Sequence, residues 1–89
     1  MHIFKKPELD EQIRTALVEL GEAEGALRYY TGERRSLQDV YDAVGTSITR
    51  AAEGMLSENL ATLTEQVETA RAAVENWNNI LDVLRKKTA

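Results

Sequence analysis

The sequence of 89 residues contains no cysteine and a single histidine, His2. Without cysteine the chain can form no disulfide and has no thiolate nucleophile, and one histidine cannot complete the usual zinc ligand sets. The Glu-x-x-His motif of di-iron bundles and the glycine-rich loops that bind phosphate are also absent. A serine nucleophile would lack a histidine base on a structured element. We therefore expect no enzymatic activity, no metal and no cofactor.

Long apolar runs and an excess of basic residues are missing as well. No segment approaches the roughly 20 apolar residues that span a membrane, and the first residues lack the apolar run of a signal peptide. The chain has 11 basic and 15 acidic residues and a net charge of −4. Domains that bind duplex DNA normally have a clear basic excess. The composition thus predicts a soluble, cytoplasmic protein that binds neither a membrane nor duplex DNA.

What the sequence does contain is a regular spacing of apolar residues, alternately three and four positions apart. This spacing averages 3.5 residues, the period of helices that pack side by side as in coiled coils, whereas a half-buried strand would repeat every two residues. A chain this short holds one core. We therefore expect a single all-α domain over residues 1–89. The spacing is seen in three runs, which extend from Leu9 to Tyr30, from Leu37 to Met55 and from Leu60 to Leu84.

The end signals predict helices at about 7–30, 36–56 and 57–86. Pro7 suits the first turn of a helix, and Thr31-Gly32 is a natural stop, because glycine accepts the backbone conformation that follows a helix end. Ser36 is a good cap for the second helix. The apolar spacing then shifts between Met55 and Leu60, which favours a new helix from about residue 57.

These boundaries predict a three-helix bundle that runs up, down and up. The alternative fuses the second and third segments into one long helix, which gives an antiparallel two-helix hairpin. Gly45-Thr46-Ser47 could also interrupt the second helix, with Thr46 or Ser47 as a new cap. The apolar spacing nevertheless continues from Val44 to Ile48, so we prefer one helix there.

The most unusual local composition is the segment from Arg28 to Arg35, which has three arginines and two tyrosines at the expected first turn. Arginine and tyrosine are frequent at protein-binding hot spots, and together they can also hold a nucleotide or another anion. The ordinary interpretation is a solvated helix end and loop. In the three-helix bundle, Arg85-Lys86-Lys87 would lie at the same end of the molecule and add to this basic cluster.

Trp77 marks a second candidate surface, on the third predicted helix. The apolar stripe around it is wider than a seam with one neighbouring helix requires. Such a stripe lies either at the centre of a three-helix core or at an interface with another subunit. Because so small a domain gains limited stability from its own core, we expect a homo-oligomer. The candidate binding residues are Arg28, Tyr29, Tyr30, Arg34, Arg35, Trp77, Ile80 and Leu84.

The sequence therefore predicts a non-enzymatic helical protein that acts by protein–protein binding, as an adaptor, an inhibitor or a chaperone-like protein. One alternative is a small anion or nucleotide binder that uses the segment from Arg28 to Arg35. Another is an assembly component of a phage particle or a secretion machine.

Overall fold

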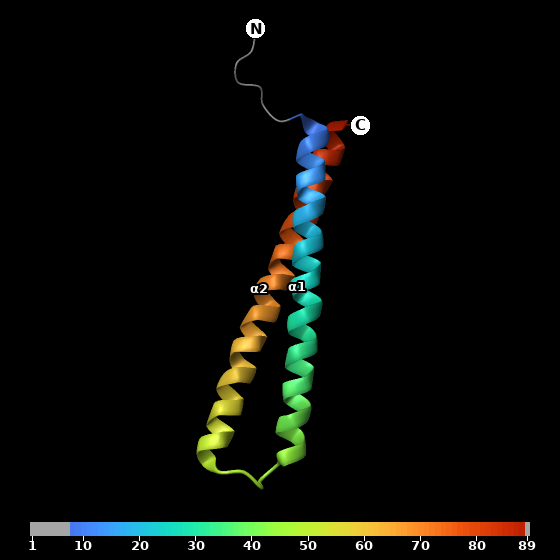
Figure 1. The fold of residues 1–89 in the computed structure, drawn as a ribbon. Coiled ribbons are helices and arrows are strands. Elements are labelled where there is room, and N and C mark those ends of the chain that lie inside the picture. The colour runs from blue at the N-terminus through green and yellow to red at the C-terminus, as the bar shows by residue number, and fades with distance from the viewer. Residues whose placement is uncertain (1–7, 89) are drawn as a thin grey trace, which may run out of the picture.

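The computed structural model describes residues 8–88, which form two long helices and no strand. Helix α1 spans Leu9–Val44 and helix α2 spans Arg50–Thr88. They lie side by side and antiparallel, with the first turn of α1 beside the last turn of α2 and a short loop of residues 45–49 at the far end (Figure 1). The molecule is a rod of 71 × 27 × 13 Å. The all-α prediction is confirmed, whereas the three-helix bundle is wrong.

The predicted stop at Thr31-Gly32 lies inside α1, which continues for 12 residues beyond Gly32 to Val44. The reason is Arg34, which lies four residues after Tyr30 and three before Leu37 and is half-buried. Its aliphatic stem occupies the position that an apolar residue would take, so the spacing of three and four is never broken. A glycine inside a helix costs only about 1 kcal/mol relative to alanine. Gly32 is therefore tolerated within α1.

The predicted boundary at residue 57 lies inside α2. Met55 is 65% exposed and does not belong to the contact between the helices. Leu56 is half-buried and takes its place, four residues before Leu60. The spacing therefore continues without a shift, and Ser57 caps nothing. The alternative hairpin had the right number of helices, but it placed the turn between residues 30 and 36.

The chain reverses at Gly45, whose φ of 52° and ψ of −122° match the first central position of a type II′ turn. The Ser47 N–H donates to the Val44 carbonyl at 2.9 Å and closes this turn. The Gly45 N–H donates to the Tyr41 carbonyl at 3.3 Å. This hydrogen bond satisfies one of the carbonyl groups in the last turn of α1. A positive φ is readily adopted only by glycine, so Gly45 determines where the hairpin turns.

The cap of α2 is Thr49 instead of Thr46 or Ser47. The Ala52 N–H donates to the Thr49 hydroxyl at 3.2 Å, and the Glu53 N–H donates to the Thr49 carbonyl at 3.0 Å. A side-chain oxygen at this position satisfies one of the free N–H groups of the first helical turn. The loop therefore ends at residue 49 and α2 begins at Arg50.

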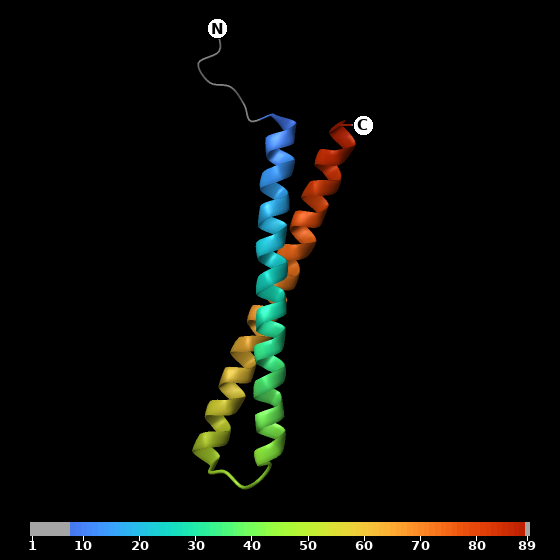
Figure 2. The ribbon, with the colours of Figure 1, turned by 45° about the vertical axis from the view of Figure 1, so that its right-hand side comes forward.

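The two helices share a narrow core. The cluster at the chain ends contains Ala16, Leu81 and Leu84, with Trp77 and other partly buried apolar residues against it. The helices cross near their middle (Figure 2). Close to the loop, the Tyr41 hydroxyl donates to the Glu53 carboxylate at 3.1 Å. In the described part of the chain the buried apolar residues are Ala16, Ala23, Val67, Ala70, Leu81 and Leu84.

Candidate functional site

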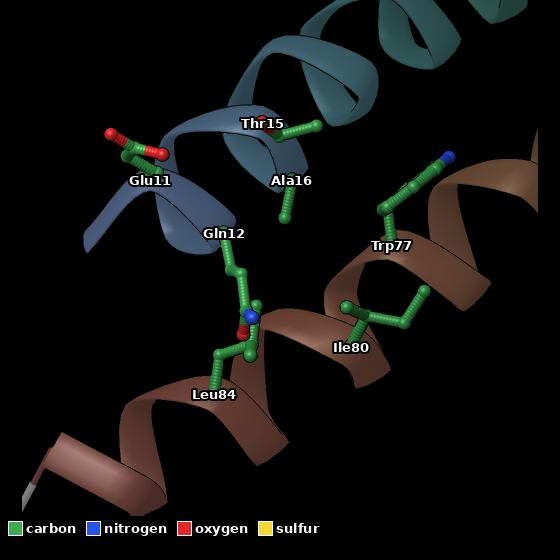
Figure 3. Close-up of a pocket in the computed structure, with 7 residues that line it drawn as sticks. All are labelled: Glu11, Gln12, Thr15, Ala16, Trp77, Ile80 and Leu84. Atoms are coloured by element: carbon green, nitrogen blue, oxygen red, sulfur yellow. The ribbon is translucent and has the colours of Figure 1, made fainter. Parts of the chain in front are cut away.

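An apolar groove lies between the helices near the chain ends and has a volume of ≈ 480 Å³. Figure 3 shows side chains from α1 and α2 on its two sides. Trp77 is half-buried there and Ile80 is 40% exposed, so solvent reaches both side chains. The groove is lined by Glu11, Gln12, Thr15, Ala16, Trp77, Ile80 and Leu84.

A second groove of ≈ 330 Å³ lies nearer the middle of the hairpin. Four of its lining residues are alanines, two from each helix. Small side chains at these positions allow a further backbone to approach the pair closely, which large side chains would prevent. The lining residues are Ala23, Ala26, Tyr30, Gln66, Thr69, Ala70 and Ala73.

Both grooves lie on the same side of the hairpin. Residues three and four apart share one face of a helix. The lining residues of α2 follow that spacing from Gln66 through Ala73 and Ile80 to Leu84. On α1 the spacing links Gln12 of the first groove to Ala26 of the second in steps of seven. We call the residues that line the two grooves the groove face, and the opposite side of the hairpin the back face.

Most of the exposed large apolar side chains belong to the groove side. Val83 lines a further hollow of ≈ 260 Å³ on α2 together with Ile80. The same side also carries Tyr29, Val40 and Met55. Each of these residues lies two heptads, or 14 positions, from a groove-lining residue and therefore projects in the same direction. Five of the seven exposed large apolar residues thus lie along the groove face; the full set is Leu17, Val18, Tyr29, Val40, Met55, Ile80 and Val83.

The back face is polar by contrast. Asn78 and Thr64 are exposed there, and Arg71 forms a 3.0 Å ion pair with Glu68. Both ends of this ion pair are more than half exposed, so it contributes little to stability. The hairpin therefore has one face suited to an apolar partner and one suited to water.

The two edges of the groove face differ in charge. We call the edge formed by α1 the α1 margin and the edge formed by α2 the α2 margin. The α1 margin is acidic, because Glu11 lines the first groove and Glu19, Glu22 and Glu33 lie one heptad from other lining residues. Among the described residues of the α2 margin, Lys87 carries the single charge, one heptad after Ile80. An occupant of this face would therefore meet carboxylates on the α1 side and, apart from Lys87, uncharged side chains on the α2 side.

The eight predicted binding residues do not form one site. Trp77, Ile80 and Leu84 come together in the first groove. Tyr30 lines the second groove, and the Tyr29 ring meets it edge to face with centroids 5.2 Å apart. The remaining three residues lie elsewhere on α1: Arg34 faces the other helix, while Arg28 and Arg35 project toward the back face.

The expected cluster of basic residues at one end of the molecule is not formed. Arg34 lies in α1 on the loop side of the middle, opposite about residue 64 of α2, because Ala16 packs with Leu81 and Leu84. Lys86 lies 22 residues beyond residue 64, roughly 33 Å further along α2. The arginines of α1 and the basic end of α2 are therefore too far apart to hold one anion.

The alanines of the second groove were missed as site residues by the sequence interpretation. Ala23 and Ala70 belong to the apolar spacing of the sequence, which by itself does not identify them as site residues. Ala26 and Ala73 lie three residues after them, and this repeated pair on both helices is the signal that could have identified the face. It becomes meaningful only when both helices are known to lie side by side.

In the described part of the chain, no group of histidine, cysteine, aspartate and glutamate side chains is arranged to hold a metal ion. His2 lies outside the described residues. No helix within residues 8–88 is long and apolar enough to cross a membrane.

Comparison of the chain with protein-family models, with curated proteins and with solved structures finds no match.

Proposed function

We propose that this chain acts by protein–protein binding and that the groove face takes up a helix of its partner. The observation that carries the proposal is the open apolar groove between the helices, with Trp77 and Ile80 accessible in it. Tryptophan is among the residues most frequent at the hot spots of protein interfaces. An adaptor, an inhibitor or a chaperone-like protein would each use such a face. The proposal includes a cytoplasmic location, the default for a chain that has no cysteine for disulfides.

The amount of exposed surface supports a missing partner. The accessible surface is 7024 Å², whereas a compact monomer of this mass has about 5,200 Å². The radius of gyration is 20.1 Å, against about 12 Å for a compact domain of this length. A two-layer hairpin with so few buried residues leaves apolar area in water that a third helix would cover.

The dimensions of the groove face suit a helix. From Gln66 to Leu84 the lining residues of α2 extend over 18 positions, which is about 27 Å or five helical turns. Packed helices approach to 8–10 Å depending on the side chains between them, and alanines permit the shorter distance. An amphipathic helix with apolar residues at positions i, i+3, i+4 and i+7 would therefore fit, as in other helix-in-groove complexes.

The test is site-specific photo-crosslinking in the cells that make this protein. A photoreactive amino acid replaces Ala73 on the groove face in one variant and Asn78 on the back face in the matched control. We expect the variant at position 73 to give a crosslink to a helical segment, identified by mass spectrometry, and the control to give none. Equal crosslinking from both positions, or none from position 73, would contradict the proposal.

A further inference from the structure

We infer that the occupant of the groove face is a second copy of this chain, packed face to face to form an antiparallel four-helix bundle. This inference rests on the proposed function, since it names the partner of the same face. Each copy presents to the groove of the other copy an amphipathic helix whose exposed stripe has alanines near the middle of the hairpin and larger apolar residues toward the chain ends. The stripe on α2 contains Ala70, Ala73, Trp77, Ile80 and Leu84.

The exposed area is sufficient for such a dimer. The chain exposes about 1,800 Å² more than a compact monomer of its mass. A standard stable interface removes about 800 Å² from each partner. Less than half of this difference would therefore be enough, and five of the seven exposed large apolar residues lie on the groove side.

Charge selects between the two ways in which the faces can meet with twofold symmetry. If α1 lay beside α1 of the second copy, the acidic margins with Glu19, Glu22 and Glu33 would face each other, and like charges at this range repel. If α1 lies beside α2 of the second copy, the acidic margin instead meets the uncharged one. Glu11 then also lies near Lys87 of the second copy, because the two ends coincide.

This arrangement fixes the position of the loops. In this arrangement α1 packs against an antiparallel α2 of the second copy, in the same register as against its own α2. The twofold axis then runs parallel to the helices. Both loops then lie at the same end. Ala26 of one copy is level with Ala73 of the other, so small residues meet where the helices must approach most closely.

The first experiment measures mass and tests the face. Light scattering on the full chain is expected to give twice the 10.0 kDa of one chain at micromolar concentration. Ala73→Arg and Ile80→Lys should each weaken dimerisation at least tenfold, whereas Asn78→Arg on the back face should leave it unchanged. Far-UV circular dichroism verifies that each variant remains helical. Trp77, the single tryptophan, should shift its emission to shorter wavelength as wild-type dimer forms.

The second experiment measures the arrangement. Because the chain has no cysteine, Thr46→Cys in the loop provides one spin-label site per chain. Loops at the same end should give a label-to-label distance below about 35 Å, since packed helices are separated by 8–10 Å. Loops at opposite ends would give more than about 45 Å, because α1 has 36 residues and extends roughly 54 Å.

Each outcome has one meaning. A dimer that is weakened only by the groove-face substitutions, with a short label distance, supports the inference. A long label distance overturns the arrangement of α1 beside α2. A wild-type chain that stays at 10.0 kDa at 100 µM overturns the second copy as occupant. In that case a crosslink from position 73 to a different protein would leave the proposed function standing, and its absence would remove both.

Discussion

Two glycine-to-alanine substitutions should have opposite effects on stability, because Gly45 and Gly32 have different roles. Gly45 has φ of 52° in the turn, whereas Gly32 lies inside α1 with nothing within 4 Å of the position that a Cβ would take. Alanine at position 45 would hold a strained backbone, which costs about 1–3 kcal/mol. The lower entropy of the unfolded chain offsets about 0.4–1 kcal/mol of this. We therefore expect Gly45→Ala to destabilise the protein by about 1–2 kcal/mol.

Gly32→Ala should instead stabilise the protein by about 1 kcal/mol, the difference in helix propensity between the two residues. The two variants then differ by about 2–3 kcal/mol. For a domain of this length, 1 kcal/mol corresponds to about 4–8 °C in Tm, so their melting temperatures should differ by about 10–20 °C. Gly21→Ala is the matched control, since position 21 also lies in α1 and is open, and it should behave as Gly32→Ala does.

The assay is thermal and urea unfolding followed by far-UV circular dichroism. All variants are compared at one protein concentration, because association would shift the apparent stability. A destabilised Gly32→Ala together with a neutral or stabilised Gly45→Ala would refute the reasoning. That pattern would mean that the chain turns at Thr31-Gly32, as a three-helix bundle requires.

Two further substitutions test the core and the cap. Leu81 is 2% exposed, so Leu81→Ala should cost about 2–5 kcal/mol in urea unfolding, while Val18→Ala at a 55% exposed position should stay within about 0.5 kcal/mol; similar losses for both would contradict the observed core. Thr49→Ala should cost about 1 kcal/mol in the same assay because it removes the cap of α2, whereas Thr49→Ser should retain most of the stability; equal losses for alanine and serine would show that the hydroxyl is not the cause.

The all-α class could be predicted because the spacing of three and four extends over nearly the whole chain. The number of helices could not be predicted, because Gly32 and Ser36 resemble a helix end and a helix cap although the helix continues through both. An arginine beside Gly32 is typical of a solvated loop, but Leu37 lies seven residues after Tyr30, and in a continuous helix the position of Arg34 between them faces the partner helix. In α2 the neighbouring Met55 and Leu56 are both apolar, and only contact with α1 shows which one is covered.

The turn illustrates the same difficulty. Gly32 and Gly45 are both followed within a few residues by a residue that can cap a helix, so the local signals are nearly equivalent. The two glycines differ in how well the helices on either side of each can pack against one another. A turn after residue 44 leaves two helices of 36 and 39 residues, which can pair along almost their full length. A turn after residue 30 would pair a short helix with a longer one and leave part of the apolar stripe of the second uncovered.

The candidate site was predictable where its residues share a helical face. Trp77, Ile80 and Leu84 are separated by three and four positions, so they had to lie together whatever the rest of the fold was. The segment from Arg28 to Arg35 is contiguous instead, and eight consecutive residues of a helix are distributed around its whole circumference. Once that segment is helical, its arginines and tyrosines separate onto the seam and both faces. Because α1 extends through Gly32, the residues of this segment do not share one face, whereas the spacing of Trp77, Ile80 and Leu84 keeps those three side chains together in the first groove.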